Sequence, residues 1–273
     1  MSGNQIDIGI VFRPQSPPEE LRAMVAETED AGVAELWLWE DCFREGGIAA
    51  AAAALSWSSH LRVGLGLLPV PLRNPALAAM EIATVARLWP ERFVATLGHG
   101  MQEWMAQAGG RVESPMTLLH EHVVAIRRLL DGEEVTVGGR YVQLDQVKLA
   151  WPPPRRPELI IGARGPRTIA LAGAEADGVL LDTTTNVSTV RRARDILDEA
   201  RASSGRTGRS KVYAYTAVDT TKDPASLTAR LTEWVAALKA AGADVVLVHG
   251  SDDQPHGREI VRLLRRESRT PQR

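Results

Sequence analysis

The chain has 273 residues, a formal net charge of -2 at pH 7 and one cysteine. No excess of Lys and Arg is available to attract nucleic acid, and one cysteine excludes a disulfide framework and a four-thiolate metal site. The length suits one large domain, and the cysteine count favours a reducing cytoplasm.

The N-terminus, MSGNQIDIGIVF, lacks the basic start, apolar run and small-residue cleavage site of a signal peptide. The longest apolar stretch, residues 48–55, is too short to span a bilayer. We therefore expect a cytoplasmic protein that acts on a small molecule and has no membrane or nucleic-acid partner.

Short β-rich runs alternate with helical runs along the chain, which predicts βα units and a parallel sheet. The predicted strands cover residues 6–12, 34–39, 61–68, 93–97, 159–161, 178–181, 212–218 and 245–248. The predicted helices cover residues 17–32, from 47, 75–89, 115–130, 166–174, 187–204, 224–240 and 256–266. Eight such units favour a closed α/β structure, the (β/α)8 or TIM barrel, in one domain over residues 1–273.

Residues 131–157 interrupt this alternation between units four and five. Val135–Val137 and Tyr141–Leu144 flank the pair Gly138-Gly139, which predicts a β-hairpin with a glycine turn. Trp151 and three prolines after it predict a stiff, extended return.

Glycine is frequent where three predicted strands end, at residues 64–66, 98–100 and 162–165. The functional sites of such barrels lie at the C-terminal ends of the strands. Turn formation would explain any one of these segments, but three at one end favour a flat ligand lying against the backbone.

The segment Gly162-Ala163-Arg164-Gly165-Pro166 leads directly into a predicted helix. Free N–H groups and the helix dipole suit an anion there, and Arg164 or Arg167 could add a charge. The segment matches neither a Walker loop nor a dinucleotide fingerprint. The expected ligand of this segment is a phosphate group at the end of a cofactor.

A few side chains at these strand ends could carry chemistry. Asp41 could orient or protonate a ring, or only cap a loop. Cys42 is expected to be an inert thiol, because no histidine is visibly paired with it. His99 stands between two glycines, and Glu103 follows it closely.

No serine elbow and no zinc ligand set is present, and His120 and His122 diverge on a helix, so no metal site is expected. A bound cofactor would then supply the chemistry.

Two strings carry a family resemblance: GLGLLPVPLRNPALAAMEIATVARLWPERFVATLGHG (64–100) and IIGARGPRTIALAGAEADGVLL (160–181). They resemble the strand-three-to-four region and the phosphate loop of bacterial-luciferase-like flavin and deazaflavin oxidoreductases. The resemblance covers nearly the whole chain, including the hairpin. It implies a TIM barrel, a flavoprotein-type cofactor and a homodimer.

The resemblance also implies site residues. A cis peptide is expected at Gly66-Leu67 beneath the cofactor ring, and Asp41 matches an aspartate that contacts the ring in deazaflavin-using members. Proton transfer is assigned to Asp41, His99 or Glu103. The implied cofactor-binding residues are Asp41, Gly66, Leu67, Leu68, Gly98, His99, Gly100, Gly162, Ala163, Arg164, Gly165 and Pro166.

The chain departs from the family at several places. Cys42 stands where a histidine often follows the aspartate. Met101 and Gly46 stand where sugar-phosphate dehydrogenases have an acidic residue and a tryptophan, so a sugar phosphate is not the expected substrate. We expect an oxidoreductase that transfers a hydride between the deazaflavin coenzyme F420 and a small organic molecule. An FMN-dependent monooxygenase and a non-catalytic flavin-binding barrel are the alternatives.

Overall fold

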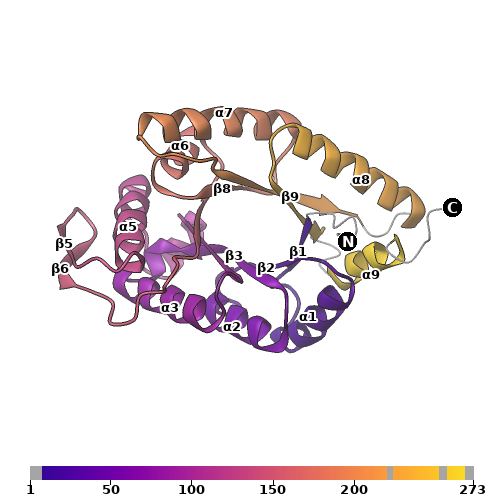
Figure 1. The fold of residues 1–273 in the computed structure, drawn as a ribbon, viewed down its shortest axis with the longest axis horizontal. Helices are drawn as coiled ribbons and strands as arrows, with labels where there is room; N and C mark the ends of the chain where they lie inside the picture. The colour runs from indigo at the N-terminus through magenta and orange to yellow at the C-terminus, as the bar shows by residue number, and fades with distance from the viewer. Residues whose placement is uncertain (1–7, 220–223, 252–256, 268–273) are drawn as a thin grey trace.

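The computed structural model describes residues 8–219, 224–251 and 257–267. Within them, eight parallel strands close into a barrel in the order β1-β10-β9-β8-β7-β4-β3-β2, and helices surround it (Figure 1). The strands are β1 (Ile8–Phe12), β2 (Glu35–Leu38), β3 (Arg62–Pro69), β4 (Phe93–Gly98), β7 (Glu158–Ala163), β8 (Gly178–Leu181), β9 (Lys211–Val218) and β10 (Val245–Gly250). The predicted TIM barrel is confirmed. Residues 6–7 of the first predicted strand and the tail lie outside the described residues.

The helices follow the predicted order with small differences in their ends. They are η1 (Pro18–Glu20), α1 (Leu21–Asp30), α2 (Gly47–Trp57), η2 (Val70–Leu72), α3 (Pro75–Leu88), α4 (Gln102–Gln107), α5 (Pro115–Leu130), α6 (Pro166–Glu175), α7 (Val187–Ser203), α8 (Pro224–Ala240) and α9 (Gly257–Glu267). Helix α4 was not predicted, because six residues are too few to show a helical period. No described helix has the length and apolarity that crossing a membrane requires.

Barrel strands are buried on both faces because one face meets the helices and the other fills the barrel. The interior holds a separate apolar cluster that includes Trp37, Trp39, Tyr213 and Tyr215. Space for the Trp37 indole exists because β3 carries Gly64 beside it: a Cβ there would lie 2.4 Å from two indole carbons. The barrel is therefore a packed core and not a pore.

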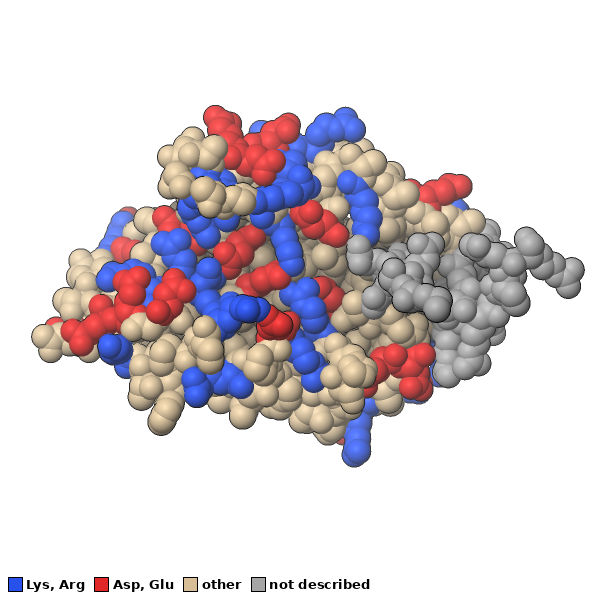
Figure 2. Space-filling model, viewed as in Figure 1, with Lys and Arg blue, Asp and Glu red and all other residues tan. Residues whose placement is uncertain are grey.

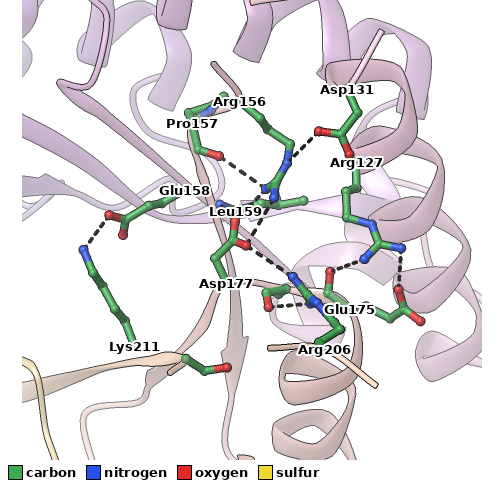
Figure 3. A network of polar contacts seen from close by, with 12 residues as sticks. Arg127, Asp131, Arg156, Pro157, Glu158, Leu159, Glu175, Asp177, Arg206 and Lys211 are labelled. Carbon is green, nitrogen blue, oxygen red and sulfur yellow. Dashed lines mark hydrogen bonds and ion pairs between the residues drawn. The ribbon is translucent and has the colours of Figure 1, made fainter. Parts of the chain in front are cut away.

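Ion pairs connect residues at the N-terminal ends of neighbouring barrel strands. Asp177, just before β8, accepts hydrogen bonds from Arg156 at 2.6 and 3.2 Å and from Arg206 at 3.3 Å (Figure 3). Glu158, at the start of β7, pairs with Lys211 at 2.5 Å in the same view. The face in Figure 2 shows basic and acidic side chains interleaved rather than an area of one sign. These charges serve the fold, away from the glycine-rich strand ends.

The predicted hairpin is confirmed as β5 (Val135–Gly138) and β6 (Gln143–Val147), which project beside α5 (Figure 1). The second strand begins two residues later than predicted. The reason is Glu121 of α5, whose carboxylate accepts the backbone N–H groups of residues 140, 141 and 142 at 2.8–2.9 Å. Tyr141 and Val142 thus belong to the connection and not to the strand.

Candidate active site

A cavity of about 300 Å³ opens at the C-terminal ends of β2, β3, β4, β7 and β8. It is lined by Trp39, Glu40, Asp41, Gly66, Leu67, Pro69, His99, Gly100, Met101, Trp104, Gly162, Ala163, Arg164, Asp182, Thr183 and Tyr215. Larger hollows beside α8 and α3 contain none of the glycine-rich strand ends. The barrel therefore gathers most of the predicted site residues around one cavity.

One end of the cavity has an aromatic floor under an unusual backbone. The peptide bond Gly66-Leu67 is cis, as the family resemblance implied. The Tyr215 hydroxyl donates a hydrogen bond of 3.1 Å to the Gly66 carbonyl, and the Tyr215 ring lies edge-on to Trp39 at 5.3 Å. Burial raises the pKa of Tyr215 far above its ordinary value, so the phenol remains a donor. Leu68 is buried beneath this end and does not line the cavity.

Two of the strand-end glycines make room for a side chain of the protein itself. A Cβ on Gly98 would lie 2.5 Å, and one on Gly162 2.4 Å, from Cδ2 of Leu67. Their direct role is to seat Leu67 across the ends of β4 and β7, and Leu67 in turn borders the cavity.

Asp41 lines the same cavity, and the residue before it is held by several hydrogen bonds. Burial raises the pKa of Asp41, and the nearby Arg44 and Arg13 oppose that rise. Its neighbour Glu40 accepts two hydrogen bonds from Arg73 and one of 2.6 Å from the Gly47 N–H at the start of α2. The Asp41 carboxyl thus favours its protonated form more than an exposed aspartate does.

The surroundings of Cys42 favour the inert thiol that the sequence predicted. Burial and the charges of Glu40 and Asp41 raise the pKa of Cys42. A thiol that resists ionisation is a poor nucleophile. The bond from Cys42 to Phe43 is also cis, which no sequence pattern indicated.

The end of β7, Gly162 to Arg164, lines the cavity, and α6 starts directly after it without lining the cavity itself. Gly165 is its N-cap and Pro166 its first residue, and no atom lies within 4 Å of where a Gly165 Cβ would stand. First-turn N–H groups have no partner within the helix, so this open end suits an anion. Arg164 does not offer a lone charge, because its guanidinium pairs with Asp182. Arg167 is exposed.

His99 lines the cavity and contacts this helix. Its Nε2 shares a hydrogen bond of 3.3 Å with Oγ1 of Thr168, in the first turn of α6. Its Nδ1 is buried and has no hydrogen-bond partner among the described residues. Burial lowers the pKa of His99, and the Pro115 backbone opposes that shift, so the ring favours its neutral form more than an exposed histidine does. Glu103 is exposed on α4 and does not line the cavity.

Residues in or beside this cavity that were not predicted as site residues include Trp39, Thr168, Asp182 and Tyr215. Asp182 follows the predicted strand 178–181 directly, so the strand-end rule could have found it, and Trp39 ends another predicted strand. Tyr215 and Thr168 carry no such signal. They reach the site through the register of β9 and the position of α6.

The chain is similar to known proteins in sequence and in fold. The family profile described as "Luciferase-like monooxygenase" matches residues 6–272. The 5,10-methylenetetrahydromethanopterin reductase of Methanolobus tindarius is 28% identical over 250 residues, which cover 89% of this chain and 75% of that protein. The F420-dependent hydroxymycolic acid dehydrogenase of Mycobacterium tuberculosis is 30% identical over 70% of this chain and 54% of its own length.

Solved structures show the same fold. The coenzyme F420 dependent tetrahydromethanopterin reductase of Methanopyrus kandleri superposes with a TM-score of 0.81 at 18% identity, covering 96% of this chain and 98% of that one. A type II Baeyer-Villiger monooxygenase of Pseudomonas putida in complex with FMN gives 0.68 at 15% identity, covering 83% and 71%. With the profile match over residues 6–272, these findings show that the chain belongs to the luciferase-like monooxygenase family.

Proposed function

We propose that this protein is an oxidoreductase that transfers a hydride between the deazaflavin coenzyme F420 and a small organic substrate. The observation that carries the proposal is one cavity with an aromatic, cis-peptide floor, bordered by the end of β7, after which the open N-terminus of α6 follows directly. The floor suits a flat ring, and the helix N-terminus suits a phosphate. Both sequence relatives compared above, by their names a methanopterin reductase and an F420-dependent dehydrogenase, catalyse redox reactions.

The residues present fit such a coenzyme. Leu67 and Trp39 would lie against the ring, and Gly165 leaves space for a phosphate at the start of α6. When bound, the coenzyme supplies the hydride. Asp41 would hold a proton at its carboxyl oxygen and exchange it with the substrate, because burial keeps this acid protonated to a higher pH than usual. Glu103 stays a prediction, since it lies outside the cavity lining.

The test is to titrate the purified apoprotein separately with oxidised F420 and with FMN, following cofactor fluorescence. Tight binding of F420, followed by reduction of a carbonyl, imine or activated alkene, is the expected result. Tight binding of FMN alone would replace the proposal by the monooxygenase alternative. Binding without turnover of any substrate class would favour a non-catalytic flavin-binding barrel.

A matched pair of variants tests where the coenzyme binds. Gly165→Asp places a carboxylate at the open start of α6, and Gly138→Asp places one on the hairpin, where the added side chain also meets open space. The first should weaken coenzyme binding at least ~10-fold by repelling the phosphate, and the second should leave it unchanged. Equal affinities would place the phosphate elsewhere.

We also propose that two copies pair through α3. Leu77, Met80 and Leu88 are exposed on this helix, and Trp151 is exposed beside it. A two-fold pair buries the same apolar surface on both partners, which suits a face of this kind. Sedimentation should show a dimer for the wild type and a monomer for Met80→Glu. A wild-type monomer at micromolar concentration would end this part of the proposal. The cytoplasmic location remains a prediction.

A further inference from the structure

Glu40 lines the cavity, yet both of its carboxylate oxygens are engaged within the protein. Oε1 accepts a hydrogen bond from Nη1 of Arg73, and Oε2 accepts one of 2.8 Å from Nη2 of Arg73 and one of 2.6 Å from the Gly47 N–H. The Glu40 side chain is 9% exposed and that of Arg73 17%. These bonds occupy the carboxylate, so the role of Glu40 lies in the segments that it connects.

The bond between Glu40 and Gly47 joins the two ends of the loop that carries Asp41. Asp41 follows Glu40 directly, and Gly47 is the first residue of α2, so one carboxylate ties both ends of the loop 41–46. First-turn N–H groups have no partner within the helix, and a negative charge is favourable there. Inside the loop, the Arg44 N–H donates to the Asp41 carbonyl at 3.0 Å. The backbone at Asp41 is therefore part of a compact, closed turn.

Arg73 is itself anchored to two helices. Its Nε donates to Glu81 on α3 at 3.1 Å, and its carbonyl accepts a hydrogen bond of 3.1 Å from Nε2 of His122 on α5. Its terminal nitrogens Nη1 and Nη2 donate side by side to Glu40. A bidentate pair fixes orientation as well as distance, and a pair with so little exposure is only weakly screened by salt. Arg73 therefore holds Glu40 in one place and orientation.

Arg73 also continues the segment that supports the cavity floor. Strand β3 contains the cis bond Gly66-Leu67 and leads into η2, and Arg73 follows η2 directly. Strands β2 and β3 are neighbours, with Leu38 opposite Leu65. The pair between Glu40 and Arg73 thus connects the loop that carries the acid with the segment that carries the cis bond.

We propose that Glu40 and Arg73 are positioning residues that set the place of Asp41 relative to the Gly66-Leu67 bond. The inference rests on the proposed function in taking Asp41 as the proton donor. Such a donor must lie within hydrogen-bond reach of the substrate, and a displacement of about 1 Å can cost about 100-fold in rate. Loss of the pair should therefore lower kcat by releasing Asp41. Coenzyme affinity should change little, because Leu67 and the cis bond remain in place.

The first experiment uses the free protein. Hydrogen exchange over residues 41–50 is measured by mass spectrometry in wild type and in Glu40→Gln, which keeps the shape of the side chain but removes its charge and one acceptor. Exchange there should be at least ~10-fold faster in the variant. Glu158→Gln is the matched control: Glu158 pairs with Arg62 at 3.1 Å and Lys211 at 2.5 Å, but at the opposite end of the barrel. It should leave this exchange unchanged.

The second experiment measures kcat and coenzyme dissociation constants for Glu40→Gln, Asp41→Asn and the double variant. Glu40→Gln should lower kcat ~10–100-fold with an unchanged dissociation constant. In the Asp41→Asn background the same substitution should cause no further loss, because its effect passes through Asp41. A merely structural role would multiply the two losses. Arg73→Lys keeps the charge without the paired donors and should reproduce the loss, so it carries the test if thermal melts show that Glu40→Gln is unfolded.

The two proposals fail in different ways. Equal exchange over residues 41–50, or equal kcat, in wild type and Glu40→Gln would overturn the positioning role and leave the coenzyme assignment intact. Multiplied losses in the double variant would overturn the positioning role as well. Turnover with FMN alone, with a kcat loss that disappears in the Asp41→Asn background, would support the positioning role and refute F420. Absence of turnover with either coenzyme would refute both proposals.

Discussion

Two glycine-to-alanine substitutions would bring the new methyl group equally close to a neighbouring side chain, but one of these side chains can move and the other cannot. In Gly162→Ala the new methyl group would lie 2.4 Å from Cδ2 of Leu67, and in Gly64→Ala it would lie 2.4 Å from two indole carbons of Trp37. Trp37 is fully buried inside the barrel. Leu67 is half-buried and borders the cavity, so the end of its side chain has somewhere to go.

The magnitudes follow from that difference. Overpacking a rigid core costs about 1–3 kcal/mol, and we expect Gly64→Ala near the upper limit because the indole cannot rotate. Moving the end of one leucine from its rotamer costs about 0.5–1.5 kcal/mol, so Gly162→Ala should lose about 1 kcal/mol of unfolding free energy. For coenzyme binding we expect the opposite order, with Gly162→Ala losing more affinity than Gly64→Ala. A displaced Leu67 enters the space of the ring, and affinity should fall at least ~10-fold, or about 1.4 kcal/mol.

Urea unfolding gives the stabilities and fluorescence titration gives the affinities. Leu67→Ala in the Gly162→Ala background removes the overlap, so a double-mutant cycle should show a coupling of about 0.5–3 kcal/mol. Gly64→Ala serves as the matched control, since Leu67 is not its neighbour. If Gly162→Ala were as destabilising as Gly64→Ala and bound coenzyme normally, Leu67 would be fixed in place and the reasoning refuted.

Three further predictions concern single groups. Tyr215→Phe removes the donor to the Gly66 carbonyl and should lower the unfolding free energy by about 1 kcal/mol; an unchanged urea midpoint would show that this bond adds nothing. Despite its burial, Asp177 has a lowered pKa, because Arg156, the Leu159 N–H and Arg206 favour its charged form. The stabilisation by Asp177 is therefore fully present above its unfolded pKa of about 3.9, and it is lost as the pH falls through the lower folded pKa. In Asp177→Asn, the free energy of unfolding should fall less steeply with decreasing pH between about pH 5 and 2. Asp41, with its raised pKa, should make kcat fall as the pH rises through that pKa. The residual kcat of Asp41→Asn should lack this fall, and a fall that persists in the variant would assign it to another acid.

Much of this protein follows from local sequence patterns. Alternating β-rich and helical runs predicted the barrel, because the strand and helix periods are set by neighbouring residues. Gly165 and Pro166 predicted the start of α6 for the same reason, since cap preferences act over a few positions. The cis bond at Gly66-Leu67 came from the family resemblance, and no period or propensity indicated the second one at Cys42-Phe43.

The chemistry of the cavity depends on contacts between residues far apart in the chain. Tyr215 reaches Gly66 across 149 positions, and His99 reaches Thr168 across 69. Arg164 was expected to add a charge to the anion site, but the barrel brings Asp182 beside it and the charge is shared. The sequence alone thus determined the elements and the end of the barrel at which the candidate site lies. Only strand register and barrel closure decided which side chains meet there, because register sets partners that no local pattern encodes.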